Sequence, residues 1–128
     1  RWYPLVSLCQ IENNSAPQGG GAHIAEGDIM ASTITGNVAS QWGGGLSLFK
    51  STASQCTVND NTATTGGGGI WTGMGCSILD CVVTDNTLTD SASTGGGGIA
   101  CAGGTVVSGM TVHGNSPTNC NSDCPACP

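Results

Sequence analysis

The stretch Gly66-Gly67-Gly68-Gly69-Ile70 has close counterparts along the chain, and this repetition decides how the chain is organised. Similar glycine runs with a following apolar residue are Gly19-Gly20-Gly21-Ala22, Gly43-Gly44-Gly45-Leu46 and Gly96-Gly97-Gly98-Ile99. Aligned on residues 19, 43, 67 and 96, the runs lie 24, 24 and 29 residues apart. A repeat of this length is typical of stacked-repeat architectures.

A second marker repeats in register with the glycines, namely an aliphatic residue followed three positions later by asparagine. These asparagines are Asn14, Asn37, Asn61, Asn86 and Asn115. Between the markers apolar residues alternate with a period of two, which predicts short strands with one face inward. The sequence therefore predicts an all-β fold, a parallel β-helix (β-solenoid) of about five coils. A small antiparallel sandwich would not require whole coils to align column by column.

We expect a single domain over residues 1–128, with coils at about 5–18, 19–42, 43–66, 67–95 and 96–117 and a cysteine-rich tail at 118–128. Glycine fits the sharp corners of such a coil because it reaches positive φ without steric cost. The asparagines are expected to stack as a structural amide ladder that satisfies buried polar groups. The longer coil contains the polar segment 89–93, which we expect to bulge outward.

Composition excludes several classes of partner. The formal net charge is −6, and Arg1 and Lys50 are the only strong cations. This disfavours nucleic acid and anionic membrane surfaces, both of which need clustered basic residues. No apolar run approaches the ~20 residues of a membrane span, so we expect a chain that is not membrane-embedded. Because the chain begins at Arg1 without a charged-then-apolar leader, we expect a processed product or an excised segment.

The eight cysteines favour an oxidising setting, and we expect an extracellular or cell-surface protein. Asn13, in the sequon Asn13-Asn14-Ser15, is a glycosylation candidate. The disulfide candidates are Cys9, Cys56, Cys76, Cys81, Cys101, Cys120, Cys124 and Cys127.

Several pairings are open. Cys56 and Cys81 fall in one inward column on neighbouring coils, where they are either a disulfide or two buried thiols. Cys76 and Cys101 also belong to adjacent coils and could form a bridge. The tail cysteines either form an intramolecular cap or link the end of one molecule to Cys9 at the start of the next.

Asp60 and Asp85 occupy equivalent places on adjacent coils, about 4.8 Å apart by strand stacking. Such a pair is a weak calcium candidate and is also close to the carboxylate spacing of retaining glycosidases. The structural alternative is two solvated turn residues. No cation lies in their column, and His23 and His113 belong to different walls. We therefore expect no catalytic residues, no enzymatic activity and no cofactor. The outward threonine column is interrupted, which disfavours an ice-binding plane.

The two markers resemble the repeats of the chlamydial polymorphic outer membrane proteins and of related right-handed β-helix passengers. Their Gly-Gly-Ala-Ile and Phe-x-x-Asn motifs correspond here to Gly68-Gly69-Ile70 and Val58-Asn59-Asp60-Asn61. The similarity covers roughly residues 5–117. Isoleucine or valine replaces phenylalanine, and a third glycine replaces alanine. The resemblance implies a right-handed β-helix and an extracellular, surface or adhesive protein.

The apolar segment Trp2-Tyr3-Pro4-Leu5-Val6 and the lack of a predicted helical cap suggest exposed ends. Ends that match each other form a heterologous contact, and its repetition gives a filament. We therefore expect a structural extracellular solenoid that stacks end to end into a fibre, with itself as partner. The alternatives are an adhesin-like surface passenger segment that binds glycans or a host surface, and a carbohydrate-active β-helix enzyme.

Overall fold

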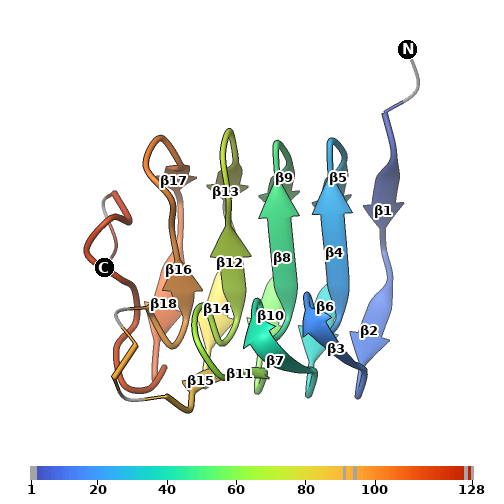
Figure 1. Cartoon of the computed structure of the whole chain (residues 1–128). Helices are drawn as coiled ribbons and strands as arrows, with labels where there is room; N and C mark the ends of the chain where they lie inside the picture. Colours follow the sequence, from blue (N-terminus) through green and yellow to red (C-terminus); the bar gives the residue numbers. More distant parts are fainter. Residues whose placement is uncertain (1–2, 91, 94, 126, 128) are drawn as a thin grey trace.

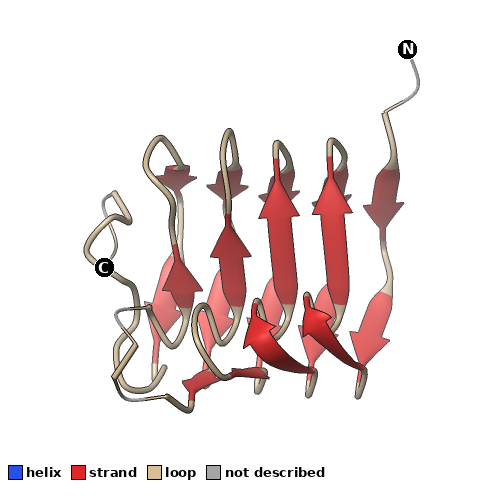
Figure 2. Cartoon of the chain, in the orientation of Figure 1, coloured by secondary structure: helices blue, strands red, loops and turns tan. Residues whose placement is uncertain are grey.

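The chain forms a stack of coils built from short parallel strands. The computed structural model describes residues 3–90, 92–93, 95–125 and 127. In this part of the chain all regular secondary structure is β-strand (Figure 2), and no helix is present that could cross a membrane. The coils follow one another from the N-terminal to the C-terminal end of the stack (Figure 1). The prediction of an all-β parallel solenoid is confirmed.

Four sheets, here named A to D in chain order, run along the stack. Sheet A contains β1 (Leu5–Ser7), β5 (Asp28–Met30), β9 (Thr52–Ser54), β13 (Ser77–Leu79) and β17 (Val106–Ser108). Sheet B contains β2 (Gln10–Glu12), β6 (Thr33–Thr35), β10 (Thr57–Asn59), β14 (Val82–Thr84) and β18 (Thr111–His113). Sheet C contains β3 (Ser15–Gln18), β7 (Val38–Trp42), β11 (Thr62–Ala63) and β15 (Thr87–Leu88). Sheet D contains β4 (Ala22–Ala25), β8 (Leu46–Phe49), β12 (Ile70–Thr72) and β16 (Ile99–Ala100).

Every strand pairs in parallel with the equivalent strand of a neighbouring coil. At the C-terminal end, sheets C and D are extended by single parallel bridges to the chain after β18, Thr87 to Ser116 and Ile99 to Cys120. The handedness, the count of about five coils and the coil boundaries stay predictions.

The core is a narrow strip of packed side chains that runs along the stack, and each sheet contributes one or two inward columns to it. Sheet A supplies the column Val6, Ile29, Ala53, Ile78, Val107, and sheet B supplies Ile11, Ile34, Val58, Val83, Val112. Their central members are fully buried, whereas Val6 and Ile11 at the N-terminal end are only half-buried. Burial of apolar surface along these columns contributes ~25 cal/mol per Å², and it drives the stacking of the coils without large aromatic residues.

The coil turns between sheets at residues with left-handed backbone conformation. The D–A corner contains Glu26, Lys50, Gly75 and Gly104; the A–B corner contains Leu8, Ala31, Gln55, Asp80 and Gly109; the B–C corner contains Asn13, Gly36, Asp60, Asp85 and Gly114; the C–D corner contains Gly19, Gly43 and Gly67. All have φ between 49° and 86°. One residue in this region reverses the chain sharply enough to start the next strand, and for side chains other than Gly, Asn and Asp it costs ~1–2 kcal/mol.

The glycine runs at the C–D corner also allow close approach between coils. A Cβ on Gly45 would lie 2.8 Å from the carbonyl oxygen of Gly69 and 3.0 Å from Nδ2 of Asn61. Packing therefore requires glycine at residue 45, whereas at Gly43 the φ of 68° favours it.

The segment 89–93 of the longer coil is attached to the preceding coil by hydrogen bonds. Asp90 donates its backbone N–H to Thr64, and the Ser93 hydroxyl donates to the carbonyl of Thr65. The segment is thus tied back to the preceding coil, while Ser91 and Thr94 lie outside the described residues.

Candidate functional site

The asparagine ladder is the main polar structure of the interior. The backbone N–H of Asn37 donates to Oδ1 of Asn61 at 2.9 Å, and that of Asn61 donates to Oδ1 of Asn86 at 3.0 Å. Each Nδ2 also donates to a carbonyl in the preceding coil, and those of Asn37 and Asn61 donate to the carbonyl two residues earlier as well; for Asn61 these acceptors are Ile34 and Asn59 at 3.0 Å each. These three central asparagines are fully buried, so the ladder satisfies polar groups that water cannot reach.

The ladder has a direction and a closed end. Asn14 begins it by donating to Oδ1 of Asn37 at 2.9 Å. At the other end the backbone N–H and Nδ2 of Asn115 both donate to Oδ1 of Asn119, at 3.3 and 3.1 Å. Asn119 thus takes the place of the next coil's asparagine. Sequence reasoning missed this residue because it lies only four positions after Asn115 rather than one repeat later.

At the A–B corner, cysteine and serine perform the same task. The backbone N–H of Cys9 donates to Oγ of Ser32 at 3.1 Å, and that of Cys56 donates to Sγ of Cys81 at 3.4 Å. The Ser32 hydroxyl and the Cys56 and Cys81 thiols each donate to the carbonyl two residues earlier, at 2.9 to 3.3 Å. Of the two alternatives for Cys56 and Cys81, the structure therefore contains buried thiols.

The two thiols affect each other's ionisation. The hydrogen bond shared with Cys56, together with burial, raises the pKa of Cys81 well above its usual range. The same hydrogen bond, with backbone N–H donation from Ser32, lowers the pKa of Cys56 to about 7 although burial opposes this. The pair therefore gives up one proton far more readily than the second.

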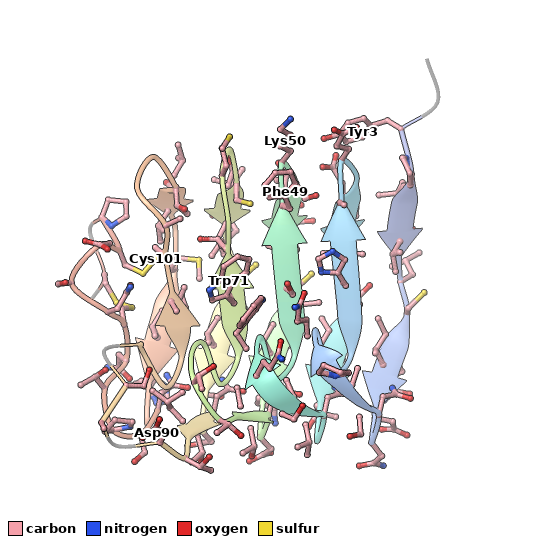
Figure 3. The ribbon with its side chains drawn as sticks, viewed as in Figure 1. Tyr3, Phe49, Lys50, Trp71, Asp90 and Cys101 are labelled. Carbon is pink, nitrogen blue, oxygen red and sulfur yellow. A yellow bond between two sulfur atoms is a disulfide. The ribbon has the colours of Figure 1, made fainter. Side chains whose placement is uncertain are left out.

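The disulfides lie in the tail. Cys101 bonds Cys124, with a Cα–Cα distance of 4.9 Å (Figure 3), and Cys120 bonds Cys127. These bonds correspond to the intramolecular cap, and they leave no tail cysteine for a bond to the exposed thiol Cys9 of another molecule.

The possible bridge between Cys76 and Cys101 is not formed, because Cys101 bonds Cys124 and Cys76 is a free thiol. Cys101 lies level with Thr72 because β16 and β12 pair Ile99 with Ile70. Cys76 precedes Ser77, which pairs with Val106, so Cys76 lies at the D–A corner instead. Its buried thiol donates to the carbonyl of Met74 at 3.7 Å.

Asp60 and Asp85 are exposed corner residues. Both have φ of 57°, and their column otherwise holds asparagine and glycine. Asp60 accepts a hydrogen bond from Nδ2 of Asn59 at 2.8 Å. Among the described residues no group of three or more His, Cys, Asp or Glu could hold a metal ion. The geometry thus gives these aspartates a turn role, for which the left-handed conformation selects Asp, Asn and Gly.

Neither His23 nor His113 forms a site with Asp60 and Asp85. His23 lies on sheet D, where its Nδ1 is 3.0 Å from Oγ of Ser47, and His113 ends β18. The expectations of no catalytic residues and no enzymatic activity stay predictions.

Comparison with known proteins supports the reading of the coil as a repeat unit. Residues 55–73 match the family model described as the Chlamydia polymorphic membrane protein repeat. This 19-residue segment is therefore similar to the polymorphic membrane protein repeat. No curated protein and no solved structure matches the chain. The matched segment runs from the A–B corner through β10, β11 and the glycine run to Gly73, and so includes both sequence markers.

The stack carries an aromatic cluster on its outer face. Trp71, on β12, lies with its ring centroid 5.3 Å from that of Trp42, at the end of β7. Phe49 lies on the neighbouring strand β8, with Nζ of Lys50 5.5 Å from its ring centroid, and Figure 3 shows Trp71 and Phe49 on this side of the stack. Sequence analysis missed the cluster because its members occupy different columns of successive coils.

Both ends of the stack present strand edges. At the N-terminal end β1 to β4 each pair on one side only. At the C-terminal end the tail covers the edges of sheets C and D, whereas β17 and β18 keep a free edge within the described structure. The family of the repeat suggests an outer-membrane or surface location.

Proposed function

We propose that the chain is a structural, extracellular β-solenoid of the cell surface that stacks end to end into a filament. The observation that carries this proposal is the pair of free parallel edges, β1 and β2 at one end and β17 and β18 at the other. Unpaired strand edges are templates for pairing with another chain. A contact between unlike ends does not close on itself and therefore extends into a fibre.

The tail restricts the contact between two copies to part of the C-terminal end but does not prevent it. It is held against sheets C and D by backbone hydrogen bonds such as Gly97 N–H to Thr118 and Ile99 N–H to Asn119, and by the disulfide of Cys101. Among the described residues, none pairs with the outer edges of sheets A and B. The partner in this proposal is therefore a second copy of the chain, bound through half of its end surface.

A surface setting is supported by the polymorphic membrane protein repeat and by the two disulfides. Asn13, the glycosylation candidate, is an exposed residue of the B–C corner at the first coil. A glycan there would sit beside the N-terminal edge and restrict its contacts.

The test is negative-stain electron microscopy together with multi-angle light scattering over a concentration series of the purified, oxidised chain. We expect rods whose axial repeat is about 24 Å per subunit, from five strands at about 4.8 Å each. A chain that remains monomeric at all concentrations up to the millimolar range would refute the filament.

A second candidate is an adhesin-like surface segment that binds glycans. The outer aromatic cluster favours it, because its half-buried tryptophan rings leave aromatic contact area available at low entropic cost. A glycan array probed with the wild-type chain and with Trp71→Ala tests this role. Binding that is unchanged in the variant, or no binding by the wild-type chain, would exclude the cluster as a glycan site.

A further inference from the structure

We infer that the joint between two copies is a parallel edge-to-edge pairing of β17 and β18 of one copy with β1 and β2 of the next. This inference rests on the proposed end-to-end stacking and specifies its register. The pairing between copies repeats the parallel strand pairing that each coil already makes with its neighbour.

The inward columns continue across such a joint. Val107 ends the sheet A column that Val6 begins, and Val112 ends the sheet B column that Ile11 begins. Stacking in this register places valine against valine and valine against isoleucine. It buries Val6 and Ile11, which are only half-buried in the isolated chain.

One of the two outward columns of sheet A is apolar only at its two ends. It reads Leu5, Asp28, Thr52, Ser77, Val106. Leu5 is 58% exposed and Val106 is 53% exposed, although the positions between them are polar. In the joint these two side chains become direct neighbours, and each removes apolar surface of the other from water.

One outward column of sheet B is ionisable only at its two ends. It reads Glu12, Thr35, Asn59, Thr84, His113. Glu12 and His113 are both exposed, and the same register makes them neighbours. An acidic and a basic residue directly opposite each other across strands are favourable, whereas two like charges are unfavourable.

Sheets C and D are left out of this pairing. Asn119 fills the ladder position above Asn115, so this joint requires Asn119 to yield that position to the next copy's Asn14. The tail bridges to β15 and β16 hold the other two edges. The joint therefore selects its register through the two end columns of sheets A and B rather than through the asparagine ladder.

The experiment is sedimentation velocity on the full oxidised chain over a concentration series at about pH 5.5, where histidine side chains carry a positive charge and glutamate a negative one. Glu12→Lys places a cation opposite His113, and His113→Glu places two carboxylates together. We expect each variant to weaken association about tenfold, as the loss of one favourable pair and the gain of one unfavourable pair. The double variant Glu12→Lys/His113→Glu restores an opposite-charge pair and is expected to recover wild-type association.

The matched control is Thr57→Lys, which adds a charge to the exposed face of the same sheet at mid-stack. It is expected to assemble like the wild-type chain. If filaments form but both single variants assemble normally, or the double variant is not rescued, the register is wrong and the filament proposal stands. If the wild-type chain does not assemble, both proposals fail.

Discussion

Replacing Asn61 by alanine in the middle of the ladder is expected to destabilise the fold strongly. The side chain is fully buried, and its Oδ1 accepts from the backbone N–H of Asn37 at 2.9 Å and from Asn37 Nδ2 at 3.0 Å. Its own Nδ2 donates to the carbonyls of Ile34 and Asn59. The substitution removes all of these bonds without admitting water to the groups that remain.

The magnitude follows from which groups keep a partner. In the variant, the Nδ2 of Asn37 still donates to the carbonyls of Ile11 and Thr35. The backbone N–H of Asn37, however, loses its acceptor, Oδ1 of Asn61. One orphaned buried donor costs ~1–3 kcal/mol, and each net hydrogen bond lost costs ~1 kcal/mol more. We therefore expect the free energy of unfolding to fall by about 3–5 kcal/mol.

Asn14→Ala is the matched control, because it removes the same side chain from the same ladder at its exposed end. Its Nδ2 donates to Oδ1 of Asn37 at 3.2 Å, and the backbone N–H of residue 14 keeps its own bond to that oxygen. We expect a loss of about 1 kcal/mol or less.

The assay is urea denaturation followed by tryptophan fluorescence and circular dichroism, with the m-value checked for each variant because a solenoid can unfold in parts. Equal losses for the central and the end variant would refute the reasoning. So would a loss below about 1 kcal/mol for Asn61→Ala, since both results would mean that the ladder adds no stability through burial.

Three further perturbations test the corners and the tail. Cys81→Ser is expected to change the free energy of unfolding by less than about 1 kcal/mol, because a hydroxyl can accept the same N–H, whereas Cys81→Ala should cost about 1–3 kcal/mol by orphaning it; equal effects in urea denaturation would contradict this. Gly45→Ala should lower Tm steeply, because its Cβ would meet backbone oxygen 2.8 Å away, while Gly103→Ala, with nothing within 4 Å, should leave Tm unchanged; calorimetry separates the two. The Cys101→Ser/Cys124→Ser variant should lose about 3 kcal/mol and become sensitive to proteolysis in the tail; a tail that stays protected would show that the disulfide does not hold it.

The fold could be predicted because the sequence repeats its punctuation. The glycine run and the asparagine recur at fixed spacing, and the columns aligned on Asn37 and Asn61 are those that pair in the structure. Parallel stacking places equivalent residues of successive coils next to each other, so the alignment of one marker fixes the neighbours of every other position. The tail could not be aligned in this way, since it contains no marker, and the role of Asn119 depends on a local turn.

Asp60 and Asp85 show how equivalent acidic residues on adjacent coils can be mistaken for a catalytic or metal-binding pair. Asp60 and Asp85 invite a catalytic or metal interpretation only while their backbone conformation is unknown. Once both are seen at φ of 57°, the neighbouring Asn13, Gly36 and Gly114 explain them, because all three residue types tolerate the left-handed region. A column that mixes Asp with Asn and Gly is thus evidence for a corner before it is evidence for a site.

The same reasoning changes what the cysteine count means. In the A–B corner, Ser32 and Cys81 belong to the same column. Each accepts a backbone N–H with its side chain and donates to the carbonyl two residues earlier. A cysteine whose column also contains serine is therefore explained by the corner, and its presence says nothing about the redox compartment. The argument for an oxidising environment rests instead on the four cysteines that form bonds, Cys101, Cys120, Cys124 and Cys127. These lie in the last coil and the tail, where they close one end of the stack, so oxidation and the shape of the C-terminal edge are linked.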